Sequence, residues 1–146
     1  MAANNQSAFS FLGPQLLSKD GPVNTSVLDS APAVAIYFSA HWCPPCRAFT
    51  PTLGAFYDEC NEDEKQVEIV FVSCDRTQEQ FDGYYAEMPW LTVPFNPAAV
   101  DQIRAKIPFT GIPYLVVLNK DGSVKSINGR NDVTSKGPTC IDSWKN

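Results

Sequence analysis

Two cysteines separated by two prolines, Cys43 and Cys46, are the residues of this chain whose types and spacing could do chemistry. In a reduced protein, a pair with this spacing is either a redox-active dithiol or half of a zinc site. A structural zinc ion needs four ligands, which usually come from two such pairs. The sequence has no second pair and a single histidine, His41. The pattern therefore favours thiol–disulfide exchange and predicts that neither a metal nor another cofactor is needed.

The place of the pair along the chain predicts a different role for each thiol. Cys43 follows the apolar, β-rich run Ala33–Ser39 and precedes a helical pattern of apolar residues, so a strand is expected to lead into a helix there. The N-terminus of a helix favours an anion, and the thiolate is the reactive form of cysteine. We therefore expect Cys43 to attack a disulfide and Cys46, about one helical turn further on, to resolve the mixed disulfide.

The neighbours of the pair are given supporting roles. Pro44 and Pro45 suit the first turn of a helix and limit the freedom of the backbone, and Arg47 adds a positive charge. Trp42 is interpreted either as a packing residue or as an apolar docking surface for substrate. His41 is expected to be a solvated loop residue, with acid–base assistance as the alternative.

The other cysteines are not assigned chemistry. Cys60 falls on the apolar face of the predicted helix and Cys74 at the end of a strand, so both are expected in the core. Cys140 lies in a polar tail and is expected to be exposed.

The elements that must position these residues follow from hydrophobic periodicity and turn signals. A hairpin is expected around the turn Lys19–Pro22, between Leu16-Leu17 and Val23–Leu28, and the segment Met88–Phe95 is interpreted as an apolar loop. The tail after Gly129-Arg130, which end the last strand, is assigned no element. The remaining expected strands are Ala33–Ser39, Val67–Ser73, Tyr114–Leu118 and Ser123–Ile127, and the expected helices run from the cysteine pair to Cys60, over Thr77–Glu87 and over Pro97–Ile107.

This order of elements predicts an α/β fold. Strands that alternate with helices pair in parallel through right-handed crossovers, whereas the last two strands form an antiparallel hairpin. The expected result is a mixed β-sheet with helices on both faces and an N-terminal β-hairpin. Residues 1–8 are expected to be flexible, and residues 9–146 to form a single domain.

Composition excludes several classes of protein. The chain has 146 residues, 44% of them hydrophobic, as expected of one globular domain, and its net charge of −5 argues against binding to nucleic acid or an anionic membrane. A monomer is expected. No apolar run approaches the roughly 20 residues that span a bilayer. The N-terminus has no basic residue before its weakly apolar patch, which argues against a signal peptide and for a cytoplasmic location.

Four segments resemble the thioredoxin superfamily and, within it, the tryparedoxin and nucleoredoxin branch. They are Tyr37–Pro51, which contains WCPPC and FTP, then MPWLTVPF at Met88–Phe95, Gly111-Ile112-Pro113, and Gly129–Val133. The resemblance covers nearly the whole chain. It implies a thioredoxin fold and a dithiol–disulfide oxidoreductase. Ordinary thioredoxins carry a buried aspartate six residues before the first cysteine, whereas Tyr37 stands at that position here.

The resemblance also assigns roles to individual residues. It implies that Cys43 is the nucleophile, Cys46 the resolving thiol and Pro113 a cis-proline beside them. It places Trp42, Ile112, Pro113 and Arg130 on the substrate surface. A cis bond before Pro113 would leave the preceding backbone free to pair with an incoming peptide.

Two functions are consistent with these features. The first is a reductase that takes electrons from a flavoenzyme or a low-molecular-weight dithiol and passes them to protein disulfides, such as those of a peroxidase. The alternative is a redox-regulated binding module that holds a signalling partner through the same surface. An intact dithiol favours the reductase.

Overall fold

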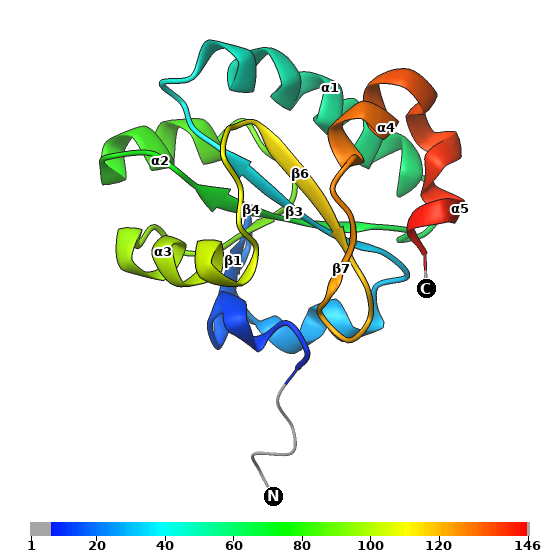
Figure 1. Cartoon of the computed structure of the whole chain (residues 1–146), viewed down its shortest axis with the longest axis horizontal. Coiled ribbons are helices and arrows are strands. Elements are labelled where there is room, and N and C mark those ends of the chain that lie inside the picture. The colour runs from blue at the N-terminus through cyan, green and yellow to red at the C-terminus, as the bar shows by residue number, and fades with distance from the viewer. Residues whose placement is uncertain (1–6, 146) are drawn as a thin grey trace, which may run out of the picture.

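The computed structural model describes residues 7–145, which form a seven-stranded mixed sheet with helices on both faces (Figure 1). The strands, in the spatial order β2-β1-β5-β4-β3-β6-β7, are β1 (Gln15–Ser18), β2 (Gly21–Asn24), β3 (Val34–Ser39), β4 (Glu68–Ser73), β5 (Leu91–Thr92), β6 (Tyr114–Leu118) and β7 (Val124–Ser126). The α-helices are α1 (Pro44–Cys60), α2 (Gln78–Tyr85), α3 (Pro97–Lys106), α4 (Gly129–Lys136) and α5 (Ile141–Trp144), and the 3₁₀ helices are η2 (Ser10–Leu12), η3 (Thr25–Ser30) and η4 (Gly137–Cys140).

Strand β3, which leads to the cysteine pair, lies in the interior of the sheet. Strand β3 pairs in parallel with β4 and antiparallel with β6, and every residue of β3 is buried. A strand covered on both faces needs a continuous apolar sequence, which explains the run at Val34–Ser39. The α/β fold, the mixed sheet and the N-terminal hairpin formed by β1 and β2 are therefore as predicted.

Side chains of alternate residues divide the core into two layers. Tyr37 of β3 faces α1, α2 and the C-terminal helices, in a cluster that includes Leu53 and Trp144. Phe38 faces the opposite side, where Ile103 of α3 and Leu12 of η2 cover the sheet. Figure 1 shows α1, α4 and α5 on one side of the sheet and α3 on the other. This alternation is what brings side chains of β3 and α1 together under the dithiol.

Three expectations about elements are wrong. The segment expected as a strand at Val23–Leu28 ends as β2 at Asn24 and continues as the 3₁₀ helix η3, in which the Thr25 side chain is buried. The expected loop Met88–Phe95 contains β5, which is short and exists because β4 and β1 pair with it. The tail is helical, because its few apolar residues pack against the layer that contains α1.

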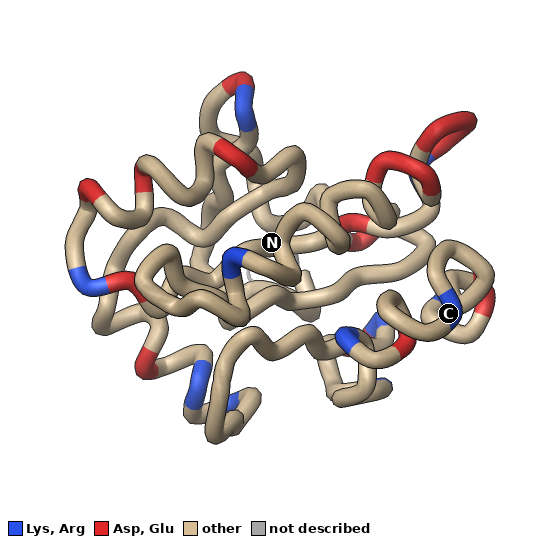
Figure 2. Tube along the Cα trace, turned by 90° about the horizontal axis from the view of Figure 1, so that it is seen from above, with Lys and Arg blue, Asp and Glu red and all other residues tan. Residues whose placement is uncertain are grey.

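Most of the segment expected to be flexible, residues 1–6, lies outside the described residues, and Ser7 donates a hydrogen bond to Asp29. Between residues 7 and 145, no helix is long and apolar enough to cross a membrane. Figure 2 shows Lys and Arg interspersed with Asp and Glu along the trace.

Candidate active site

The dithiol lies where β3 leads into α1. Cys43 is the N-cap residue of the helix, and its sulfur accepts a hydrogen bond from the backbone N–H of Cys46 at 3.3 Å. Pro44 and Pro45 occupy the first turn, where their missing N–H groups would have had no helical partner. The Cys43 sulfur is therefore a hydrogen-bond acceptor at the positive end of the helix dipole.

Cys43 is the more accessible of the two thiols, although only 6% of its surface is exposed. Its sulfur lies 4.0 Å from the backbone carbonyl of Ile112, to which the thiol donates a weak hydrogen bond. The Ile112–Pro113 peptide bond is cis, as predicted. The predicted residues Cys43, Ile112 and Pro113 therefore lie together at one edge of the sheet.

Cys46 has no exposed surface. Burial raises the pKa of its thiol to about 11, and the hydrogen bond with Cys43 adds to the rise. The Ser39 side chain and the backbone of Ala40 act in the opposite direction and lower this pKa. At neutral pH the Cys46 sulfur is therefore held as a thiol inside the protein.

Trp42 provides the largest apolar surface next to the pair. Its side chain is 41% exposed, and the guanidinium of Arg76 lies 4.5 Å from the centre of its ring. The indole N–H donates to the carbonyl of Cys74 at 3.2 Å. Cys74, expected in the core, is only half-buried and packs against the cluster that contains Cys43 and Cys46. It is a third thiol at this site.

A buried carboxylate holds the loop before the dithiol. Asp75, 6% exposed, accepts a hydrogen bond of 2.6 Å from the backbone N–H of His41 and one of 2.7 Å from the hydroxyl of Ser73. The His41 ring stacks on Tyr84, with ring centres 5.2 Å apart. His41 is therefore a loop residue, as expected, but it is half-buried and its ring packs on Tyr84.

Four hydroxyl groups lie together beneath Cys46, and the sequence analysis did not assign them to the site: those of Tyr37, Ser39, Thr50 and Tyr84. Two sequence signals were available, and the first is Tyr37, whose position six residues before the first cysteine was already noted as unusual. The second is that Ser39 and Ser73 are polar residues at the ends of two parallel, otherwise apolar strands, and such ends meet at the same edge of a sheet. Tyr84 and Thr50 gave no such signal, because their spacing resembles that of ordinary core residues on a helix.

The two remaining predicted residues lie on the surface. Arg47 is exposed in the first turn of α1. Arg130 was expected at a strand end but lies in the first turn of α4, where its guanidinium is 5.8 Å from the ring centre of Phe49. Phe49 is on the same helix as Cys46, so Arg130 approaches the site from the side of α4.

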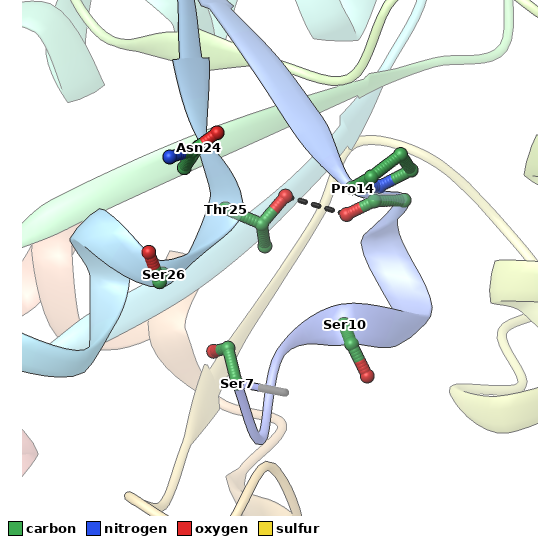
Figure 3. Close-up of a pocket in the computed structure, with 7 residues that line it drawn as sticks. Ser7, Ser10, Pro14, Asn24, Thr25 and Ser26 are labelled. Carbon is green, nitrogen blue, oxygen red and sulfur yellow. Dashed lines mark hydrogen bonds between the residues drawn. The ribbon is translucent and has the colours of Figure 1, made fainter. Parts of the chain in front are cut away.

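A cavity lies away from the dithiol, between the N-terminal segment and η3. Its volume is about 480 Å³, it is lined by Ser7, Ser10, Gly13, Pro14, Asn24, Thr25 and Ser26, and Thr25 donates a hydrogen bond to the Gly13 carbonyl in its wall (Figure 3). No thiol and no titratable side chain lines this cavity. In the part of the chain that the structure describes, no group of three or more His, Cys, Asp or Glu residues is placed to hold a metal ion.

Cys140, expected to be exposed, is buried at 3% exposure because it packs in the layer with Cys60 and Trp144.

Comparison with known proteins agrees with this geometry. A model of the thioredoxin-like family matches residues 32–124. Mouse nucleoredoxin is 41% identical over 122 residues, which are 83% of this chain but only 28% of that protein. The tryparedoxin of Trypanosoma brucei brucei is 37% identical over 133 residues, 90% of this chain and 91% of that protein. The chain thus spans less than a third of the nucleoredoxin but nearly all of the tryparedoxin.

Solved structures give the same relationship. The structure of tryparedoxin II in complex with glutathionylspermidine superimposes with a TM-score of 0.81 and 32% sequence identity, covering 94% of this chain and 97% of the other. The chain therefore belongs to the thioredoxin-like family, in the branch that contains the tryparedoxins and nucleoredoxins, and its dithiol domain is a thioredoxin-like oxidoreductase.

Proposed function

We propose that this domain reduces disulfide bonds of protein substrates, with Cys43 as the attacking thiol and Cys46 as the resolving thiol. The observation that supports these roles most strongly is the difference between the two sulfurs. Cys43 accepts an N–H at the start of α1 and keeps some exposed surface, whereas Cys46 is fully buried and its pKa is raised to about 11. The thiolate form attacks, so the first step belongs to Cys43.

The reaction proceeds in two exchanges. The Cys43 thiolate attacks one sulfur of the substrate disulfide, a mixed disulfide forms, and the other substrate sulfur leaves with the electron pair. The Cys46 sulfur then attacks Cys43, so that the Cys43–Cys46 disulfide forms and the second substrate sulfur leaves. The proton lost by Cys46 ends on the leaving thiolate, and the substrate is reduced by two electrons while the dithiol is oxidised.

The surface beside Cys43 supports a polypeptide substrate. Trp42 offers an exposed apolar ring next to the thiol, and the carbonyl of Ile112, which precedes Pro113, lies 4.0 Å from the Cys43 sulfur. We assign Trp42, Ile112 and Pro113 to substrate docking and Arg130 to a carboxylate of the substrate or donor. Arg47 contributes positive charge near the first turn of α1.

The partners follow from the chemistry. Oxidised dithiol must be reduced again by a flavoenzyme or by a low-molecular-weight dithiol. The similarity to a tryparedoxin II whose structure contains glutathionylspermidine supports a glutathione-containing low-molecular-weight thiol as the donor. We propose that the domain acts as a monomer in the cytoplasm, without a metal or cofactor, on targets such as the disulfide of a peroxidase.

Turnover of a protein disulfide tests this proposal. Reduction of insulin should be catalysed with dithiothreitol, with glutathione and its reductase, or with thioredoxin reductase and NADPH. The Cys43→Ser variant should be inactive, and Cys60→Ser, whose sulfur lies at the far end of α1, should retain the activity. If no donor supports turnover while a partner protein is retained only by one redox state of the dithiol, the domain is a redox-regulated binding module instead.

A further inference from the structure

A positive charge lies against the exposed tryptophan of the site. The guanidinium carbon of Arg76 is 4.5 Å from the centre of the Trp42 ring, and both side chains are exposed. The ring is itself held in place, because its indole N–H donates to the Cys74 carbonyl at 3.2 Å. Trp42 directly precedes Cys43, so Arg76 brings a cation close to the accessible thiol.

The donors of the Arg76 guanidinium are not used within residues 7–145. The backbone N–H of Arg76 bonds to the Gln80 side chain at 3.0 Å, but the Arg76 side chain makes no hydrogen bond with a described residue. A guanidinium that lies over an aromatic ring keeps the N–H groups along its edge for other acceptors. This fork matches the two oxygens of a carboxylate.

The carboxylates closest to Arg76 in the chain do not pair with it. Asp75 is buried and already accepts two hydrogen bonds from inside the protein. Glu79, in the first turn of α2, is exposed and forms no ion pair with Arg76. Within residues 7–145 the ion pairs all join a lysine to an acidic residue: Lys65 to Glu68, Lys136 to Asp132 and Lys145 to Asp142.

The other three arginines of the chain lie around the same site. Arg47 is in the first turn of α1, and Arg130 approaches from the side of α4. Arg104 of α3 lies 4.5 Å from the ring centre of Phe109, in the loop that leads to Ile112, and donates to the Phe109 carbonyl at 3.3 Å. All four arginines are exposed. In a chain with a net charge of −5, the surroundings of the dithiol are thus rich in arginine.

The shape of this surface fits a polypeptide with acidic side chains. Trp42 and Arg76 are exposed side by side, which leaves room for a chain segment to lie across them. An extended segment advances about 3.3 Å per residue, so side chains a few positions from a substrate cysteine can reach the ring and the guanidinium. The net negative charge of the whole chain argues against nucleic acid as the partner.

We propose that Arg76, held over Trp42, selects protein disulfides whose cysteines are flanked by Asp or Glu. This inference rests on the proposed reduction of protein disulfides and names the class of substrate for the same site. The Arg76 guanidinium pairs with a carboxylate of the docked segment while the Trp42 ring contacts its apolar part. Arg47 and Arg104 add to the preference through their charge. Arg76 determines specificity and takes no part in the exchange of the sulfur atoms.

Peptide disulfides that differ only in the residues beside the cysteine test this preference. Peptides with flanking Glu, Gln or Lys are mixed with an excess of pre-reduced protein and no donor, and their reduction is followed by acid quenching and mass spectrometry. Each rate constant is divided by that for the same peptide with dithiothreitol, which corrects for the effect of the flanking charges on the disulfide itself.

The wild type should reduce the Glu peptide about tenfold faster than the Gln peptide, the effect of one charge-assisted hydrogen bond, and the Lys peptide most slowly. Addition of salt should shrink the Glu-to-Gln ratio, because it screens exposed charges.

Substitutions of Arg76 should change this ratio in a fixed order. Arg76→Ala should lower it to near one, and Arg76→Glu should lower it further. Arg76→Lys should fall between Arg76→Ala and the wild type, because the charge remains but the planar fork is lost. A glutamate just before the N-terminus of α2 suits the helix dipole, so Arg76→Glu should fold. Arg104→Ala should have a smaller effect, since part of that guanidinium bonds to Phe109.

Lys19→Ala is the matched control. It removes an exposed cation that lies 3.8 Å from the centre of the Tyr85 ring, at the other end of α2, and should keep the ratio of the wild type. If Lys19→Ala lowers the ratio as far as Arg76→Ala, the preference reflects net charge and the role of Arg76 is wrong.

The remaining outcomes separate this inference from the proposed function. If the wild type reduces the Glu and Gln peptides equally fast, or Arg76→Glu keeps the ratio of the wild type, Arg76 selects no acidic substrate and the dithiol mechanism stands. If the wild type reduces none of the peptides, the proposed reduction of polypeptide disulfides is itself wrong, and this inference fails with it.

Discussion

The two thiols of the site differ in their surroundings although only two prolines separate them. Cys43 caps α1 and touches the Ile112 carbonyl at the surface, whereas Cys46 is enclosed by β3, α1 and α2. The helix start makes the first sulfur an acceptor of N–H groups, and burial keeps the second protonated. The proposed division between an attacking and a resolving thiol therefore follows from the positions of two identical side chains within one helical turn.

At the residue scale, Arg130 provides a test of how charged groups are bound. Its guanidinium is exposed and lies over the Phe49 ring, and no acidic side chain among the described residues forms an ion pair with it. We expect Arg130→Ala to raise KM for a carboxylate-bearing dithiol donor about tenfold, the value of one charge-assisted hydrogen bond, with kcat unchanged.

The control for this change is Lys125→Ala, which removes a cation of β7 that donates to the Lys145 carbonyl. Arg130→Lys should fall between Arg130→Ala and the wild type, because the charge remains but the planar fork is lost. An unaltered KM in Arg130→Ala would show that the guanidinium only packs on Phe49.

The residues of the site divide into those that the sequence could predict and those that it could not. The placement of Cys43 and Cys46 at the start of α1 was predictable, because a strand, a cysteine pair and a helix follow one another locally. Ser39 and Tyr84 were not, since their hydroxyls meet across 45 residues of chain and only the packing of α2 on β3 brings them together. Hydrophobic periodicity can predict that a hydroxyl-bearing side chain is buried, but it cannot predict which group that hydroxyl bonds to.

At the element scale, the start of α4 depends on a close approach to the sheet. A β-carbon built at Gly129 would lie 2.8 Å from the Leu115 carbonyl oxygen and 2.9 Å from Leu115 Cγ, which is closer than real contacts. Gly129→Ala should therefore move α4 away from β6 and lower the free energy of unfolding by about 1–3 kcal/mol, as overpacking does. Urea denaturation measures this loss.

Gly54 is the matched control for this prediction. It lies inside α1, where an added β-carbon would meet nothing within 4 Å. Alanine is the better helix former, so Gly54→Ala should raise the free energy of unfolding by about 0.5–1 kcal/mol. Equal effects of the two substitutions would contradict the packing described for α4.

The elements themselves were predictable to different degrees. Local sequence was enough to predict β3, β4 and β6, which are long apolar runs, and α1, which has an amphipathic pattern. The two-residue strand β5 does not, because it is a strand only through its partners β4 and β1. The helices α4 and α5 were missed because the tail is polar and few of its residues, such as Val133 and Trp144, are buried.

At the scale of the whole molecule, the buried thiols make the free energy of unfolding depend on pH in the alkaline range. Burial raises the pKa of Cys46, Cys60, Cys74 and Cys140 from 9.0 to about 11. In the unfolded chain these thiols ionise first, so between about pH 9 and pH 11 the folded state binds more protons than the unfolded state. The contribution is complete below pH 9 and is lost as pH rises.

We therefore expect the free energy of unfolding to fall steadily across this alkaline range when it is measured by urea denaturation under reducing conditions. Cys140→Ala should reduce the steepness of the fall, because one of the buried thiols is removed, even though the cavity lowers stability at every pH. A free energy that stays constant from about pH 8 to pH 11 would show that the thiols ionise equally in both states.

Trapping of the mixed disulfide tests the central claim, attack by Cys43 and resolution by Cys46, most directly. In Cys46→Ser the first exchange remains possible and the second does not, so a disulfide-containing protein substrate should accumulate as a covalent adduct. Peptide mass spectrometry should place the bond at Cys43, and a thiol reductant should release the substrate. Cys43→Ser should form no adduct, and the wild type only a transient one. An absence of adduct in Cys46→Ser, or a bond to Cys74 in place of Cys43, would contradict the account.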